Sequence, residues 1–243
     1  MASWFETWFD TKYYHLLYKN RDQKEASFFI SKLVDELKLE NGSKVVDLCC
    51  GKGRHSIQLN ELGYDVLGVD LSPQSIGQAK VHENQTLHFQ VHDMRDPIDQ
   101  VKADAVLNLF TSFGYFESLE ENGKVLASIH SYLKDDGLLL IDFMNPNYVI
   151  DHMVSEEIKE LEGIQFCISR YLEEGQIVKR ISFSDQGQNF EFFEKVQALD
   201  FDIFKRLLGE AGFKIEKVFG NYSLESYHEI NSERLILLAR KIA

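Results

Sequence analysis

Cysteine and proline are both scarce in this sequence, with three of each among 243 residues. The cysteines form no C-x-x-C spacing, so the sequence predicts neither a zinc site nor a redox dithiol, and we expect no metal. Cys49 and Cys50 are adjacent and Cys167 is distant from both, which is typical of a reduced chain. Because the first residues also lack the basic start and cleavage pattern of a signal peptide, we expect a cytoplasmic protein.

Basic residues are few as well. Lys and Arg number 26 against 39 Asp and Glu, which gives a formal net charge of −13. An acidic chain repels nucleic-acid phosphates and anionic lipid headgroups. No apolar run approaches the roughly 20 residues that cross a bilayer. We therefore expect a small-molecule partner and neither nucleic acid nor membrane, and a chain that works as a monomer or homodimer.

What the sequence does contain is a regular alternation of apolar runs and amphipathic helical segments. Strands are predicted at residues 44–48, 65–69, 86–91, 103–109, 138–141, 213–219 and 233–239. Helices are predicted at residues 26–37, 54–62, from Pro73, 120–133 and 201–211. Strands that alternate with helices at this spacing indicate βαβ units and a parallel sheet. We predict a Rossmann-like α/β fold whose seven-stranded, mainly parallel sheet carries helices on both faces, with a small antiparallel β insertion.

The insertion is predicted where the helical rhythm stops. Period-two alternation and Gly-containing turns indicate three antiparallel strands, at residues 164–168, 177–183 and 190–196. We place the inserted meander at residues 155–198, so that residues 1–154 and 199–243 form the main domain. Because ligands bind beyond the carboxyl ends of parallel strands, we expect the insertion to roof a substrate pocket, with a dimer interface as the alternative. In it, Arg170 and Arg180 are predicted to hold an anionic substrate.

The strongest candidate site follows the first predicted strand. That strand carries Asp47 near its end, and Gly51 and Gly53 follow before a helix begins. Glycines there let the backbone approach a ligand, and Asp70 at the end of the second strand suits a ribose diol. A dinucleotide site fits less well, because Ser56 replaces its third glycine and Asp47 would lie beside a pyrophosphate. The acid favours a ligand that is positively charged at this point.

Residues 45–110 resemble the nucleotide-binding half of the class I S-adenosylmethionine-dependent methyltransferases. Cys49 stands where their first motif usually has its first glycine, and residues 68–72 resemble the second motif, whose acid binds the ribose. Residues 92–94 resemble the segment that reads adenine, and residues 108–113 lie where the fourth motif lines the methyl-transfer site. The resemblance implies an enzyme that transfers a methyl group from S-adenosyl-L-methionine to a small molecule. The cofactor-binding residues that it implies are Asp47, Cys49, Gly51, Gly53, Asp70, Leu71, Asp93, Met94, Asn108, Phe110 and Tyr14.

No catalytic residue is singled out, because aligning an acceptor with a sulfonium methyl group and excluding water account for most of this chemistry. The titratable or hydroxylic candidates near strand ends are His92, Tyr115, Tyr222 and His228. Phe113 joins the two arginines as a predicted substrate contact. The aromatic segment at residues 4–18 is either a leading helix that folds over the cofactor or part of the core. A non-catalytic regulatory protein that binds the same cofactor, and an NAD-dependent oxidoreductase, are the alternative functions.

Overall fold

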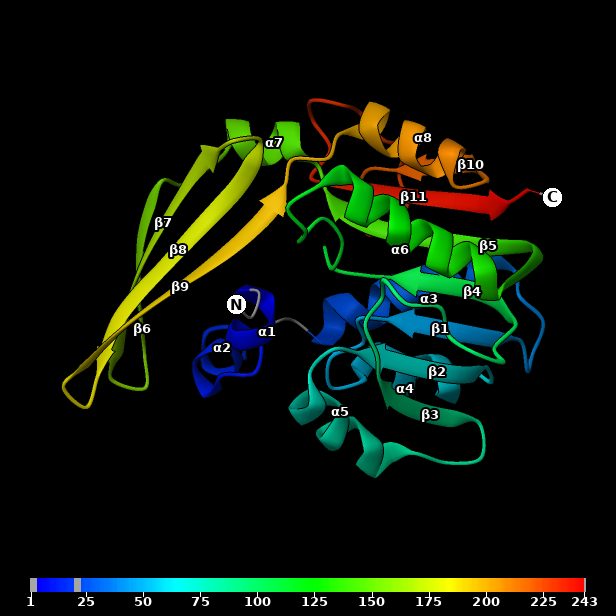
Figure 1. The fold of residues 1–243 in the computed structure, drawn as a ribbon, viewed down its shortest axis with the longest axis horizontal. Coiled ribbons are helices and arrows are strands. Elements are labelled where there is room, and N and C mark those ends of the chain that lie inside the picture. The colour runs from blue at the N-terminus through cyan, green and yellow to red at the C-terminus, as the bar shows by residue number, and fades with distance from the viewer. Residues whose placement is uncertain (1–3, 20–22, 243) are drawn as a thin grey trace.

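The computed structural model describes residues 4–19 and 23–242. Its largest sheet has the strand order β10-β11-β5-β4-β1-β2-β3 (Figure 1). The strands are β1 (Lys44–Leu48), β2 (Asp65–Asp70), β3 (Leu87–Val91), β4 (Ala103–Asn108), β5 (Leu133–Met144), β10 (Phe213–Phe219) and β11 (Arg234–Lys241). Strand β11 is antiparallel to both of its neighbours, whereas β1 to β5 pair in parallel. The predicted seven-stranded, mainly parallel sheet is confirmed.

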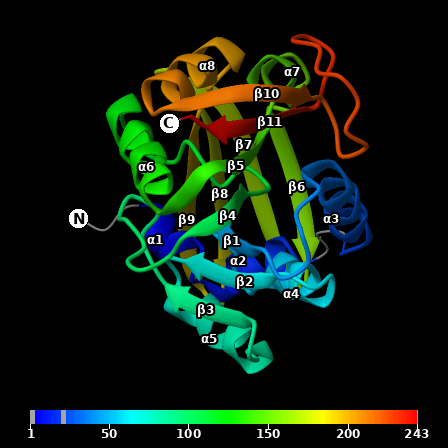
Figure 2. The ribbon, with the colours of Figure 1, turned by 90° about the vertical axis from the view of Figure 1, so that its right-hand side faces the viewer.

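Helices cover both faces of this sheet (Figure 2). Helices α6 (Leu119–Tyr132) and α8 (Phe201–Glu210) pack on one face, and α3 (Gln23–Leu37), α4 (Arg54–Glu61) and α5 (Pro73–Ala79) pack on the other. Helix α5 is followed by the 3-10 turn η1 (Lys80–His82). Because both faces are covered, the central strands β1 and β4 are almost completely buried, which explains why most of their residues are apolar.

The insertion is a separate antiparallel sheet with the order β6-β7-β8-β9 (Figure 1). Its strands are β6 (Glu156–Leu161), β7 (Ile164–Glu173), β8 (Gln176–Asp185) and β9 (Gln188–Gln197). We call it the insertion sheet. Each hairpin turn has two central residues with positive φ, the second a glycine, which is the type I′ pattern that matches strand twist. Strand β6 was not predicted, because this edge strand is mostly charged and exposed.

Two short helices, not one, begin the described chain. Helices α1 (Trp4–Trp8) and α2 (Lys12–Leu17) are separated at Thr11, whose side chain accepts a hydrogen bond from the backbone of Tyr14 and caps α2. These lid helices lie between the insertion sheet and the large sheet (Figure 1). Their buried Trp8 and Tyr13 share a small core with the insertion sheet. A further short helix, α7 (Pro146–Asp151), precedes β6. No helix of residues 4–19 or 23–242 has the length and apolar character to cross a bilayer.

Candidate functional site

A first cavity of about 700 Å³ opens at the carboxyl ends of β1 and β2. The loops that follow these strands form one wall, with Gly51 and Asp70 among its residues. The lid helices and the turn between them contribute another wall, which includes Phe9 and Tyr14, whose ring centroids are 4.9 Å apart. Ligands of open α/β sheets bind at this edge. The first cavity is therefore placed where the sequence predicted a site, and the aromatic segment both packs on the insertion sheet and covers the cavity.

The loop after β1 takes an uncommon backbone course. Cys49, Gly51 and Gly53 all have positive φ, at 66°, 56° and 80°. A Cβ on Gly53 would lie 2.5 Å from the ring of Phe89, so this glycine lets α4 pack closely on the sheet. No atom lies within 4 Å of a Cβ built on Gly51, so its role is to turn the chain beside open space. Gly53 thus allows close packing, and Gly51 leaves the loop open to a ligand.

Two carboxylates lie at the base of this loop. Asp70 accepts hydrogen bonds from the backbone N–H groups of Gly51 at 2.8 Å and Ser72 at 2.9 Å. Asp47 is 1% exposed and accepts a hydrogen bond from the Ser56 hydroxyl at 2.5 Å. Burial raises the pKa of Asp47 to about 6, against the lowering effect of Ser56. No ion pair reaches the Asp47 carboxylate within the described part of the chain. The pair gives this end of the cavity a negative potential that suits a cationic group.

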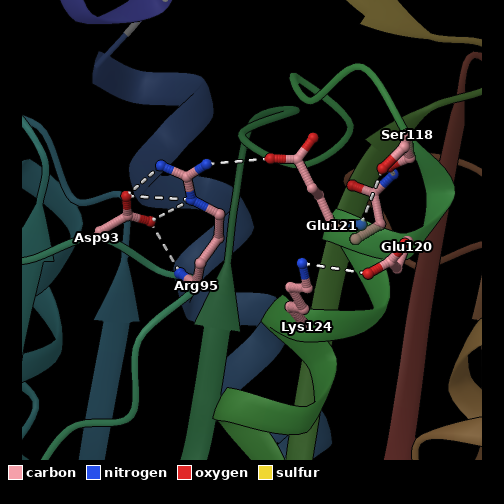
Figure 3. A network of polar contacts seen from close by, with 7 residues as sticks. Asp93, Arg95, Ser118, Glu120, Glu121 and Lys124 are labelled. Carbon is pink, nitrogen blue, oxygen red and sulfur yellow. Dashed lines mark hydrogen bonds and ion pairs between the residues drawn. The ribbon is translucent and has the colours of Figure 1, made fainter.

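Asp93, after β3, lines the first cavity and is held by Arg95 (Figure 3). Arg95 donates to it from Nε at 3.0 Å and from Nη2 at 2.6 Å, while Nη1 reaches Glu121 at the start of α6 at 3.1 Å. Burial alone would raise the pKa of Asp93, but the Arg95 hydrogen bonds outweigh it and the pKa is lowered. Asp93 is therefore an oriented, ionised acceptor.

Most of the residues predicted to bind a cofactor line the first cavity, namely Asp47, Cys49, Gly51, Asp70, Leu71, Asp93, Met94, Phe110 and Tyr14. Gly53 and Asn108 do not line it. Asn108 is fully buried, and its amide donates to the Leu48 carbonyl oxygen at 3.2 Å, so it braces the ends of β4 and β1. Of the four catalytic candidates, His92 and Tyr115 line the first cavity.

Sequence reasoning missed several lid residues that line the first cavity, including Phe5, Phe9, Asp10, His15, Tyr18 and Lys19. The Asp10 carboxylate accepts a hydrogen bond from the hydroxyl of Ser72, which also caps α5. This bond ties the lid to the loop after β2. The density of aromatic residues in this segment was the available signal, but it could not distinguish packing residues from lining residues.

A second cavity of about 400 Å³ adjoins the first, and Arg54, Phe110 and Tyr115 line both. The insertion sheet contributes directly to the second cavity, and so do Tyr222 and Arg234 from the C-terminal part of the chain. Of the predicted substrate residues, Arg170 lies here, as does the catalytic candidate Tyr222.

Three of the predicted substrate and catalytic residues line neither cavity. Phe113 is fully buried in the main core and its ring packs 5.6 Å from that of Phe204, because the loop after β4 turns its side chain inward. Arg180 is half exposed and pairs with Glu191 on the neighbouring strand β9. His228 is exposed in the loop between β10 and β11. The structure gives these residues packing or surface positions instead of the predicted site positions.

A buried ion pair shapes the loop between the two cavities. Asp142, near the end of β5, is fully buried and accepts from Arg234 Nε at 2.8 Å and Nη2 at 2.6 Å. Its other oxygen accepts from the backbone N–H of Phe110 at 2.8 Å. Phe110 and Thr111 both have a φ of 58°, a strained conformation for non-glycine residues. The pair thereby fixes the Phe110 ring, stacked 4.9 Å from His55, at the junction of the cavities.

Comparisons with known proteins agree with this geometry. Residues 39–211 match a family model described as a methyltransferase domain. The chain is 31% identical to a glycine/sarcosine N-methyltransferase of Aphanothece halophytica, over 91% of this chain and 83% of that protein. It is 26% identical to a dTDP-3-amino-3,4,6-trideoxy-alpha-D-glucopyranose N,N-dimethyltransferase of Streptomyces venezuelae, over 82% of this chain and 86% of that one. A crystal structure from Clostridium acetobutylicum, an S-adenosylmethionine-dependent methyltransferase, shares the fold with a TM-score of 0.79 at 20% identity, covering 95% of this chain and 96% of that chain.

Proposed function

The chain belongs to the class I S-adenosylmethionine-dependent methyltransferases, and from this premise we propose that it methylates a nitrogen atom of a small-molecule acceptor. The family supplies the cofactor, S-adenosylmethionine. The choice of nitrogen is supported by the two relatives above, which are N-methyltransferases of small molecules by name. The cytoplasmic location, the monomeric or homodimeric state and the lack of a nucleic-acid partner stay predictions from composition.

The observation that carries this proposal is the pair of carboxylates at the base of the first cavity. S-Adenosylmethionine has a sulfonium, an ammonium and a ribose diol. The buried Asp47 carboxylate suits the cationic part of this molecule. Each oxygen of Asp70 receives one backbone N–H, which leaves further lone pairs for the ribose hydroxyls. The ionised Asp93, which also lines the first cavity, suits the exocyclic amine of adenine. The residues present therefore fit the cofactor, and we assign them these roles.

When bound, the cofactor supplies an electrophilic methyl group, so that the acceptor nitrogen forms a bond to carbon while the carbon–sulfur bond breaks and its electron pair stays on sulfur. The protein's contribution is to align the two molecules and to exclude water. Phe110 and Tyr115 line both cavities and so mark the junction where the reacting atoms meet. The Tyr115 hydroxyl donates to the Thr111 carbonyl oxygen at 2.5 Å, which holds its ring in place. We assign the insertion sheet the role of roof over the second cavity.

Calorimetry and a transfer assay test this function. S-Adenosylmethionine and S-adenosylhomocysteine should bind in a saturable way, and NAD should not. Methyl-labelled S-adenosylmethionine should then label primary or secondary amines in a panel of small metabolites. Saturable NAD binding without a response to either sulfur compound would overturn the assignment. Cofactor binding without transfer to any acceptor would favour the regulatory alternative.

A further inference from the structure

Cationic side chains converge on the second cavity. Arg54 at the start of α4, Arg170 on β7, Lys179 on β8 and Arg234 on β11 all line it, and Glu194 is the one carboxylate among its described lining residues. The whole chain has an excess of acids, 39 against 26 basic residues. The second cavity is therefore lined by cations from four separate elements. Three of them have carboxylate partners: Arg234 pairs with the buried Asp142, Lys179 with Glu194, and Arg170 with Glu157.

We propose that the second cavity is the acceptor subsite and that it takes a small molecule with an anionic group, a carboxylate or a phosphate, at the end remote from the methylated nitrogen. This inference rests on the proposed function, because it assumes that methyl transfer takes place where the two cavities join. A volume of about 400 Å³ suits a metabolite.

The strand register of the insertion sheet decides which cations face the cavity. Arg170 is directly opposite Lys179 in the β7–β8 pairing, so both side chains project from the same face of the sheet. Arg180 is opposite Ser169 and projects from the other face. Since Arg170 and Lys179 line the second cavity and Arg180 does not, the cavity side of the sheet carries two adjacent cations. Glu194, opposite Lys179 on β9, is on the same side and pairs with Lys179.

Arg170 is the best placed of these cations to anchor an anion. Its Nη2 donates to Glu157 at 2.6 Å and its Nη1 donates to the Val154 carbonyl oxygen at 3.1 Å. These bonds use part of the guanidinium's donor set and hold it in one orientation, so that less side-chain entropy is lost when it binds a ligand. Glu157 is not among the lining residues of the cavity. Glu157 therefore positions the guanidinium of Arg170 without lining the cavity itself.

The two ends of the second cavity are built from different elements. The end that joins the first cavity is formed by Phe110 and Tyr115 with Arg54, whereas the far wall comes from the insertion sheet. Apolar side chains line the space as well, among them Val149 and Ile177. An acceptor would therefore place its nitrogen at the junction and its anionic group toward β7 and β8.

Matched pairs of amines test this assignment. Sarcosine is compared with sarcosinamide, and O-phosphoethanolamine with ethanolamine, by calorimetry on the full chain saturated with S-adenosylhomocysteine and by transfer assays. At least one anionic member should bind more tightly than its neutral-tailed partner by roughly tenfold or more, since charge-assisted hydrogen bonds to arginine are strong. The pair with the larger difference identifies carboxylate or phosphate.

Two arginine variants then locate the anion. Arg170→Met should remove most of this preference, as a rise in KM for the anionic member, while the neutral member and S-adenosylhomocysteine bind as before. Arg180→Met is the matched control, because Arg180 is also a strand arginine paired with a glutamate, and it should leave both members unchanged.

Three results would overturn the proposal. These are equal binding of anionic and neutral members, no binding of either anionic member at millimolar concentration, and a loss that is the same for both members in Arg170→Met. Each can occur with S-adenosylhomocysteine binding intact, in which case the proposed function stands. Failure of the wild-type chain to bind S-adenosylhomocysteine would instead remove the proposed function.

Discussion

The indole Nε1 of Trp8 donates a hydrogen bond to Oε1 of Glu194 at 2.7 Å, across 186 residues of sequence. The Tyr18 hydroxyl donates to the same carboxylate at 2.7 Å, and Lys179 lies 3.6 Å from it. Tyr18 lines the first cavity and Glu194 lines the second. One carboxylate on β9 therefore holds the lid helices against the insertion sheet. The insertion sheet supports the first cavity through these helices and lines the second cavity directly.

Replacing this carboxylate should loosen the lid. In Glu194→Ala, Trp8 and Tyr18 lose an acceptor whose hydrogen bonds contribute about 1.5–3 kcal/mol each. We expect red-shifted tryptophan fluorescence, faster hydrogen exchange over residues 4–19 and weaker S-adenosylmethionine binding. Glu191→Ala on the same strand is the control, since Glu191 pairs with the exposed Arg180. Unchanged fluorescence and exchange in Glu194→Ala would show that the apolar contacts alone hold the lid.

Asp70→Ala should weaken cofactor binding by roughly tenfold or more, because it removes a charged acceptor for two hydroxyl groups. The loop at Gly51 also loses its hydrogen bond to this side chain. Calorimetry with S-adenosylhomocysteine measures the loss, and circular dichroism checks the fold. Asp65→Ala, at the opposite end of β2, should bind normally. An Asp70→Ala protein that is folded and binds with wild-type affinity would contradict the ribose assignment.

Cofactor affinity should fall as the pH falls through about 6. Burial raises the pKa of Asp47 to about 6, so the carboxylate becomes protonated below that pH and loses its attraction for the cationic ligand. Affinity measured at a series of pH values should decline by up to about tenfold per pH unit in this range. Asp47→Asn should bind weakly and without this dependence. An affinity that is flat from pH 7 to pH 5 in the wild-type chain would contradict the assignment.

The same carboxylate should lower the stability of the ligand-free protein at neutral pH. Its folded pKa of about 6 exceeds the ordinary value of 3.8, so ionised Asp47 destabilises the fold above pH 6, by about 3 kcal/mol. This cost disappears as the pH falls from 6 toward 3.8. Asp47→Asn should therefore raise the Tm at pH 7 and change it less at pH 5. Equal Tm shifts at pH 7 and pH 5 would show that the change in stability does not come from the ionisation of Asp47.

Removing the insertion sheet should impair cofactor binding even though the main core is intact. Strands β6 and β9 are opposite edges of the sheet, and Glu156 is level with Phe193, four residues before Gln197. A Gly/Ser linker replacing residues 156–197 must therefore span roughly 20 Å. The variant uncovers Trp8 and Tyr13, which pack on that sheet. We expect a cooperative thermal transition, weaker S-adenosylhomocysteine binding and no methyl transfer.

The linker variant has a clear contrary result. Wild-type affinity would show that the lid helices hold their position without the insertion sheet. A change from dimer to monomer with transfer intact would favour the interface alternative over the roof.

The main fold and the base of the first cavity could be predicted from the sequence because both depend on short, continuous segments of the chain. Apolar strands buried on both faces are continuous in sequence, and in a parallel sheet their carboxyl ends meet at one edge. Asp47, Gly51 and Asp70 stand directly at or after such ends, so their proximity follows from the topology. Strand β6 escaped prediction because an exposed edge strand with charged side chains has no apolar pattern to reveal it.

Which arginine faces a cavity was decided only by the tertiary structure. Arg170 and Arg180 are hard to tell apart in sequence, since Arg180 lies on a predicted strand of the meander and Arg170 lies just after another. A register shift of one residue would exchange the two faces of a strand, and the sequence alone does not fix that register. The observed pairing of Arg170 with Lys179 directs both toward the second cavity and leaves Arg180 at the surface with Glu191. The sequence thus determined where the cofactor end of the site is, and the packing of the lid and insertion sheet determined the acceptor end, because its residues meet only through long-range contacts.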